Sequence, residues 1–261
     1  MSVYFDIARS FVKNAHQIIK DIDDTLELHA EQGFNESKNQ NKNRPRIISI
    51  EGNIGAGKST LLKHLEKHLA NSGWIFMREP LHLWDEIRDA DGCTILKKFY
   101  GDQKKYSFAF QIMSYTTRLQ ELKRLLKENP RCKGIICERS PDADRNIFTK
   151  MLHSDGCIED VEFEIYNRYF QVGRENFDID SIIYWCVPPE VCMQRIQKRS
   201  RDGEGGIPLA YLGKCHAFHS MWLDHTETPL LYLNGEVDVD SEEYGQKLQQ
   251  IEQFLEKGGS M

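Results

Sequence analysis

Five short apolar runs mark the chain from residue 46 onward. Each is nearly continuous and rich in β-branched or aromatic side chains, which is typical of strands buried on both faces of a parallel sheet. The segments between them span roughly 20–55 residues with helical periodicity, long enough for right-handed crossovers. The pattern predicts an α/β fold, a five-stranded parallel sheet with helices on both faces. The runs are Ile47–Ile50, Trp74–Met77, Gly134–Cys137, Ile182–Val187 and Leu230–Leu233.

Residues 1–45 follow a different pattern. Residues 1–30 fit one amphipathic helix, and residues 31–46 are polar and rich in Asn and Gln, which is typical of a linker. We therefore predict an N-terminal helical and polar extension over residues 1–45 and one domain over residues 46–261. The acidic run Asp21–Asp24 disfavours an import signal, so we expect a cytoplasmic rather than a mitochondrial location.

Composition excludes several classes. The chain has 261 residues, of which 40% are hydrophobic, and no apolar run approaches the roughly 20 residues of a membrane span. Its net charge of −6 does not favour a nucleic-acid polymer as partner, so any phosphate chemistry needs a local cluster of positive charge. The seven cysteines contain no CxxC pair and indicate reduced thiols. The histidine pairs His64/His68 and His216/His219 lack a third ligand in register and indicate helix surface.

A phosphate-binding loop follows the first predicted strand. Residues 52–60 read GNIGAGKST and fit the pattern G-x-x-x-x-G-K-[ST] between a buried strand and a helical stretch. Glycines let backbone N–H groups turn toward phosphate oxygens, and the helix N-terminus adds positive potential. Lys58 then reaches the β- and γ-phosphates, and Ser59 can ligate Mg²⁺. The predicted nucleotide-binding residues here are Gly52, Asn53, Ile54, Gly55, Ala56, Gly57, Lys58, Ser59 and Thr60.

The loop alone does not separate a GTPase, a motor ATPase and a small-molecule kinase. The chain has no N-K-x-D sequence to read guanine. A kinase needs a base for an acceptor hydroxyl and a basic clamp over the transferred group. Glu79 follows the second strand and Glu138-Arg139 ends the third, so all three lie at the sheet edge where such folds bind ligands. Glu79 can accept a hydroxyl proton, Glu138 can help hold Mg²⁺ and Arg139 can pair with phosphate; strand-end ion pairs are the alternative.

Three arginines supply the positive charge that the acidic balance requires. Arg195 and Arg199 share a helix face, and Arg201 begins a glycine-rich loop. This arrangement predicts an arginine-rich lid that closes over a triphosphate. The alternative is a solvated basic helix end, which also suits the helix dipole.

With these motifs together, the chain resembles the deoxyribonucleoside kinases, the family of deoxycytidine and deoxyguanosine kinases. The likeness runs in order from about residue 46 to residue 257 and implies a P-loop NTPase-like fold. The matching pieces are Gly52–Thr60, Glu79-Pro80 with Trp84, Tyr106–Gln111, Glu138–Ser140 with Asp144-Arg145, and Pro189-Glu190 followed by Arg195–Leu212.

The resemblance implies Mg²⁺-dependent, ATP-dependent transfer of the γ-phosphoryl group to the 5′-hydroxyl of a deoxynucleoside, in nucleotide salvage, by a homodimer. Glu79 resembles the general base, and Arg139 the arginine that holds it. Gln111 matches the amide that pairs with the nucleobase. Tyr100 and Glu204 match the pair on the sugar 3′-hydroxyl. Trp84, Phe110 and Phe148 would wall the base, with ordinary core as the alternative for each.

Two polar residues bear on substrate choice. Arg118 and Asp144 resemble the pocket of enzymes that take deoxycytidine and purine deoxynucleosides, whereas thymidine-preferring relatives are apolar there. Ser114 looks like the deoxyguanosine-kinase version. We expect purine deoxynucleosides or deoxycytidine over thymidine. The loop Leu233–Val239 departs from the family because it lacks an aromatic residue, which leaves the triphosphate donor open. A nucleoside-monophosphate kinase and a non-catalytic relative remain as rivals.

Overall fold

The computed structural model describes residues 44–174, 177–199, 201 and 203–259. Of the extension predicted over residues 1–45, residues 1–43 lie outside the described residues. From Pro45 onward the chain forms one compact unit. Within the described ranges, no helix combines the length and the apolar character that crossing a bilayer requires.

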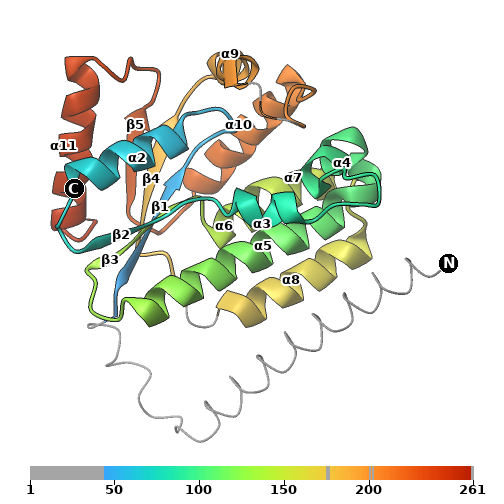
Figure 1. Ribbon diagram of the computed structural model, residues 1–261, viewed down its shortest axis with the longest axis horizontal. Coiled ribbons are helices and arrows are strands. Elements are labelled where there is room, and N and C mark those ends of the chain that lie inside the picture. Colours follow the sequence, from blue (N-terminus) through green and yellow to red (C-terminus); the bar gives the residue numbers. More distant parts are fainter. Residues whose placement is uncertain (1–43, 175–176, 200, 202, 260–261) are drawn as a thin grey trace, which may run out of the picture. The chain divides into compact units, whose positions relative to one another are not determined.

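A five-stranded parallel sheet in the order β2-β3-β1-β4-β5 forms the centre of this unit, as the apolar runs predict (Figure 1). Ile47 of β1 pairs with Ile135 of β3, and Ile50 pairs with Ile183 of β4 on the other side. The chain thus leaves β1 between two neighbours, at the switch point where doubly wound sheets bind ligands. The strands are β1 (Arg46–Glu51), β2 (Trp74–Met77), β3 (Gly134–Glu138), β4 (Ser181–Cys186) and β5 (Leu230–Asn234).

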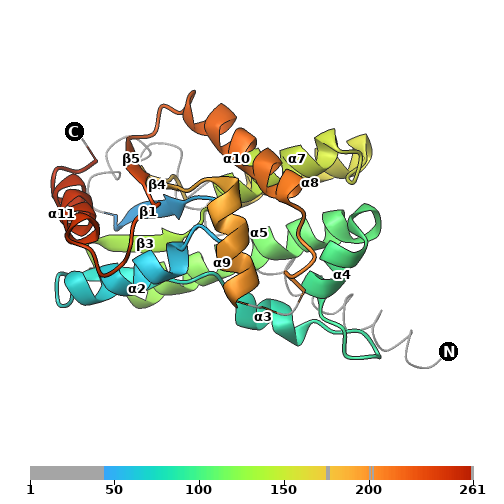
Figure 2. The same cartoon turned by 90° about the horizontal axis from the view of Figure 1, so that it is seen from above.

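Helices cover both faces of the sheet (Figures 1 and 2). Alternate residues of β1 explain the two layers: Ile48 and Ile50 pack with α2 and α11, whereas Ile47 packs with α5. The helices are α2 (Lys58–His68), α3 (Leu81–Glu86), α4 (Ile95–Gly101), α5 (Gln103–Glu128), α6 (Pro141–Ala143), the π-helical turn η2 (Asp144–Thr149), α7 (Lys150–Ser154), α8 (Asp160–Arg174), α9 (Pro189–Arg199), α10 (Leu209–Leu223) and α11 (Glu242–Glu256).

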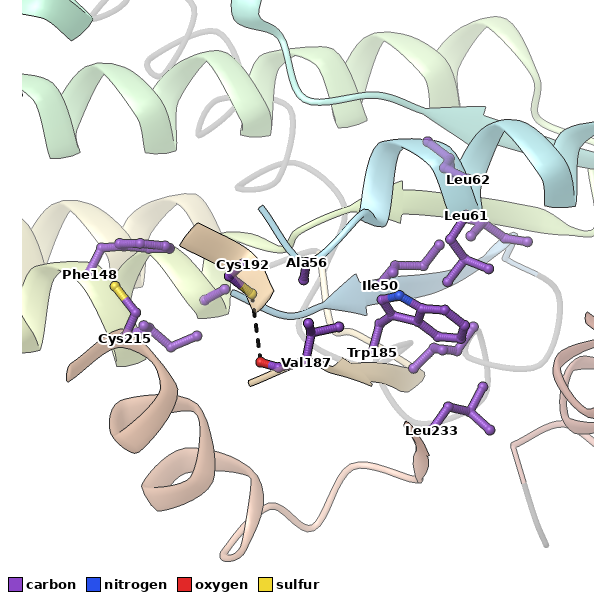
Figure 3. Packing of buried hydrophobic residues seen from close by; sticks show 14 of the residues in the cluster. Ile50, Ala56, Leu61, Leu62, Phe148, Trp185, Val187, Cys192, Cys215 and Leu233 are labelled. Carbon is purple, nitrogen blue, oxygen red and sulfur yellow. Dashed lines mark hydrogen bonds between the residues drawn. The ribbon is translucent and has the colours of Figure 1, made fainter. Parts of the chain in front are cut away.

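The largest buried cluster lies around the start of α2. Figure 3 shows Leu61 and Leu62 of α2 near Ile50 and Trp185 of the sheet. Cys192 lies in the same cluster and donates its Sγ proton to the Val187 carbonyl at 3.7 Å. All seven cysteines are free thiols, as their spacing predicts.

Candidate active site

One cavity of about 650 Å³ opens where the strands end. The P-loop after β1, the ends of β2 and β3, helix α5, the segment after α9 and the loop after β5 line it together. Every site residue predicted above lines this cavity except Gly52 and Asn53. Residues far apart in sequence therefore meet as the parallel topology requires.

Close packing explains two glycines of the P-loop. A Cβ on Gly52 would lie 2.6 Å from the Trp185 carbonyl oxygen, and one on Gly55 would lie 2.6 Å from that of Cys192. Both residues have positive φ angles, 155° and 78°, so a side chain is excluded by backbone conformation as well as by space. The Asn53 side chain anchors the loop by donating to the Leu212 carbonyl at 2.9 Å.

Lys58 and Ser59 open α2 inside the cavity. Lys58 Nζ donates to the carbonyls of Gly52 at 3.0 Å and Asn53 at 2.9 Å. Burial, and then the nearby charge of Arg139, lower the pKa of Lys58 to about 8.

Ser59 and Glu138 form the candidate magnesium site. The Ser59 hydroxyl donates to Glu138 Oε1 at 2.6 Å, so a hydroxyl and a carboxylate lie together at the helix start. These are the hard oxygen ligands that Mg²⁺ takes, and nucleotide phosphates and water complete its shell in such sites. No cluster of three or more His, Cys, Asp or Glu side chains suited to a metal occurs among the described residues. The donor set therefore fits Mg²⁺ carried in with a nucleotide.

Glu79 lies opposite the P-loop and is held by two arginines. Its Oε1 accepts from Arg118 Nη2 at 3.0 Å and lies 3.6 Å from Arg139 Nε. Burial alone would raise the pKa of Glu79, but Arg139, Arg118 and Lys58 outweigh it and lower the pKa to about 2. The carboxylate is therefore ionised at neutral pH.

Arg118 is buried in the middle of this network. Its Nε donates to Asp144 Oδ2 at 2.9 Å, and its Nη1 donates to the Glu138 carbonyl at 3.0 Å. The resemblance placed Arg118 in the base pocket; the structure adds a direct contact with Glu79. Ser114 donates to the other oxygen of Asp144 at 3.2 Å, so η2 and α5 are joined through one carboxylate.

Aromatic side chains wall the remaining part of the cavity. The Phe110 ring stacks on Phe99 at 4.5 Å and meets Trp84 edge-on at 5.4 Å. Phe148 lies under the Arg139 guanidinium at 4.7 Å. Trp84, Phe110 and Phe148 belong to the buried core and also line the cavity, so the two alternatives left open for them are compatible. Gln111 is 2% exposed, and its Oε1 has no hydrogen-bond partner among the described residues.

The predicted lid arginines have different partners. Arg195 donates to the Ala56 carbonyl at 2.7 Å and to the Gly235 carbonyl at 3.2 Å, which ties α9 to the P-loop. Arg199 and Arg201 both bind Glu204, the second through Nη1 at 2.9 Å. Tyr100 lines the cavity beside Glu204, and burial followed by the charge of Glu204 raises its pKa.

Several lining residues escaped the sequence reasoning. Tyr244 of α11 lies beside the loop Val237–Val239 in the cavity wall, and its hydroxyl is 3.0 Å from His64 Nδ1. An aromatic residue missing from that loop is thus present on the next helix. In the sequence, the signal for Tyr244 was its position in the first turn of α11, just after the loop. Only the fold shows that this turn faces the cavity. The other unpredicted lining residues are Leu81, Leu96, Phe99, Trp185, Lys198, Tyr211, Gly235, Val237, Asp238 and Val239.

A phosphate-binding loop that faces an arginine-held carboxylate across one cavity defines the class of P-loop phosphotransferases. The family model "Deoxynucleoside kinase" matches residues 48–256. The chain therefore belongs to the deoxynucleoside kinase family and is a deoxynucleoside kinase.

Similar curated proteins agree with this assignment. A probable deoxycytidine kinase of Fowlpox virus is 36% identical over 218 residues, which cover 80% of this chain and 87% of that protein. Deoxycytidine kinase 1 of Xenopus laevis is 32% identical over 253 residues, 84% of this chain and 94% of the relative. The mitochondrial deoxyguanosine kinase of Xenopus laevis is 32% identical over 223 residues, 74% of this chain and 83% of the relative.

Proposed function

We propose that this kinase transfers the γ-phosphoryl group of ATP to the 5′-hydroxyl of a deoxynucleoside, with Mg²⁺, as a step in nucleotide salvage. One observation carries the proposal: the ionised carboxylate of Glu79 lies in the same cavity as the P-loop and is fixed by two arginines. Transfer of a phosphoryl group to a hydroxyl needs a fixed proton acceptor opposite the loop that binds the donor phosphates.

Glu79 accepts a hydrogen bond from the 5′-hydroxyl and so orients its oxygen toward the γ-phosphorus. As the new P–O bond forms, the hydroxyl becomes acidic and its proton passes to the carboxylate, while the bond to the β-phosphate oxygen breaks. A pKa of about 2 keeps Glu79 in the accepting form throughout the neutral range.

Positive groups stabilise the charge that spreads over the phosphate oxygens. Lys58 and the P-loop amides hold the donor phosphates, and Arg139 lies between Glu79 and the loop, with its Nη2 3.3 Å from the Gly52 carbonyl. Arg195, Arg199 and Arg201 close from the lid side. Ser59 and Glu138 would hold Mg²⁺, which supplies further neutralisation of the phosphates when bound.

The polar wall of the pocket supports a preference for purine deoxynucleosides or deoxycytidine over thymidine. Gln111 offers a buried amide whose oxygen is free to accept from a base, and Arg118 and Asp144 fill the neighbouring wall with charge. Tyr100 and Glu204, which line the same cavity, would bind the sugar 3′-hydroxyl.

Replacing Glu79 by Gln tests the proposal. With ATP, Mg²⁺ and each of the four deoxynucleosides, we expect kcat to fall roughly 10²–10⁴-fold while nucleoside affinity, measured by isothermal titration calorimetry, is kept. The control is Glu66→Gln, which removes only an exposed pair with Arg78 and leaves turnover unchanged. Full turnover by the Glu79 variant would remove Glu79 from this role.

A nucleoside-monophosphate kinase is the rival in the same fold. It would need basic residues around the acceptor phosphate, whereas the acceptor side here presents Gln111, Tyr100 and Glu204. Comparing each deoxynucleoside with its monophosphate as acceptor separates the two. A non-catalytic relative would have lost the reacting groups, and Lys58, Glu79 and the lid arginines are all present.

We also propose that the enzyme is a homodimer that pairs through α8. Val161, Ile165 and Val172 of this helix are 69%, 48% and 50% exposed, an apolar stripe among exposed residues that are otherwise charged or polar. Sedimentation velocity of the full chain tests this: a monomer at micromolar concentration would contradict it.

A further inference from the structure

Glu51 is a buried carboxylate for which the reaction has no use. It ends β1, one residue before the P-loop, is 0% exposed and does not line the cavity. Burial raises the pKa of Glu51, against the opposing charge of Arg139 and the hydrogen bonds of Ser140. A buried carboxyl group destabilises the fold unless its hydrogen bonds and opposite charges offset the loss of its hydration.

The contacts of Glu51 converge on one neighbour. Its Oε1 accepts from the backbone N–H of Ser140 at 2.9 Å and from the Ser140 hydroxyl at 2.6 Å. The same hydroxyl accepts from the Ala143 N–H at 3.1 Å and so caps α6. Glu51 Oε2 has no partner among the described residues. The Glu51 side chain therefore holds the turn after β3 through two hydrogen bonds to Ser140.

That turn contains a strained residue. Arg139 has φ 68°, in the left-handed region that favours glycine. Among the described residues, the other non-glycine with positive φ is Asn71, a residue type that tolerates this conformation. The Arg139 N–H donates to the Ile50 carbonyl at 3.0 Å, and the next N–H donates to Glu51. Two consecutive amides bonded to the end of β1 hold Arg139 in this conformation.

The conformation decides where the guanidinium lies. Arg139 is 4% exposed; its Nε is 3.6 Å from Glu79, its Nη2 is 3.3 Å from the Gly52 carbonyl, and its plane lies over Phe148. Its Nη1 is buried without a hydrogen-bond partner among the described residues. A relaxed backbone at residue 139 would turn the side chain out of this position.

We propose that Glu51 is a positioning residue: through Ser140 it holds Arg139 in the left-handed conformation that places its guanidinium between Glu79 and the P-loop. The inference rests on the role of Arg139 in the proposed function. It assigns a purpose in the reaction to the last residue of β1, which touches no reacting atom.

A double-mutant analysis tests this. Glu51→Gln keeps the accepting oxygen and removes the charge, and Ser140→Ala removes the hydroxyl. We expect each to lower kcat roughly 10-fold with little change in nucleoside KM, because the base pocket is untouched. Added to Arg139→Gln, neither change should lower kcat further, since the group that it positions is already gone. Ser49→Ala is the matched control: equally buried on β1, with no link to the turn, it should leave kcat unchanged.

The outcomes separate the inference from its premise. If Arg139→Gln retains full turnover, the role of Arg139 in the proposed function is wrong. Suppose instead that Arg139→Gln loses turnover. If Glu51→Gln then lowers kcat by the same factor whether residue 139 is Arg or Gln, the positioning inference alone is overturned. If Glu51→Gln fails to fold, Ser140→Ala on the two backgrounds carries the same comparison.

Discussion

Two ion-pair networks line the cavity, and water reaches them to different degrees. In the pocket network, Arg118 and Asp144 are 1% and 2% exposed and join α5 to η2. In the lid network, Arg199 and Arg201 are 36% and 29% exposed and share Glu204 in the segment after α9. In the first network neither partner reaches water, whereas in the second the two arginines do, although Glu204 itself is 5% exposed.

The difference in burial teaches what each network is suited to do. A buried charge without its partner is expensive, so the pocket network keeps one geometry and suits recognition and the orientation of Glu79. Arginines that reach water lose less when a partner is removed and can exchange partners at low cost. The lid arginines are therefore suited to leave Glu204 when phosphate arrives.

Breaking the pocket network gives the largest expected effect. Arg118→Met leaves Asp144 buried without its ion-pair partner and takes one of two arginines from Glu79, so we expect the free energy of unfolding to fall by about 3–5 kcal/mol. Urea unfolding measures it. Arg124→Met, on the same helix but exposed and paired with Glu121, is the control and should cost less than about 1 kcal/mol. Equal losses would show that burial does not distinguish the two sites.

The lid should respond in the opposite way. Arg201→Ala leaves Arg199 with Glu204, so the free energy of unfolding should change by less than about 1 kcal/mol. Loss of one donor to the transferred group should still lower kcat roughly 10²-fold. Unfolding and turnover measured on one preparation check both. A large loss of stability with normal kcat would mean that Arg201 stabilises the fold and does not act on the transferred group.

Removing both members of the pocket pair sharpens the comparison further. Arg118→Met with Asp144→Ala removes the stranded carboxylate and makes the wall apolar. We expect part of the lost stability to return and the ratio of kcat/KM for thymidine over deoxycytidine to rise roughly 10-fold. Assays with both nucleosides measure this ratio. An unchanged ranking would mean that these residues do not face the base.

Much of this arrangement could be predicted from local patterns. The five apolar runs became the five strands, and Glu79, Glu138 and Arg139 reached one edge because parallel strands end there. Such features depend on periodicity and topology, both of which a single sequence carries.

The unpredicted contacts all depend on side-chain direction over long separations. Arg118 meets Glu79 across 39 positions, and Glu51 meets Ser140 across 89. Tyr244 enters the cavity only because α11 folds back beside the P-loop helix. No local pattern encodes which of several oxygens a long side chain reaches, so these partners required the structure.

Lys58 shares one property with each network. It is buried, like Arg118, and it would bind phosphate, like the lid arginines. Its pKa of about 8 means that free enzyme loses this charge just above neutral pH. We therefore expect kcat/KM for MgATP to fall to about half its plateau at pH 8 and to roughly a tenth at pH 9, because this ratio reports the free enzyme.

The matched variant is Lys58→Arg, whose guanidinium keeps its charge over this range. Its kcat/KM should be lower at every pH but flat between pH 7 and pH 9. In the native enzyme, kcat at saturating MgATP should also stay flat, because bound phosphate favours the protonated amine. If kcat/KM of the native enzyme stays constant up to pH 9, Lys58 has the ordinary pKa of an exposed lysine. The P-loop carbonyls that accept from Lys58 would then fully offset the effect of burial on its pKa. In that case burial would not distinguish the pH dependence of Lys58 from that of the lid arginines.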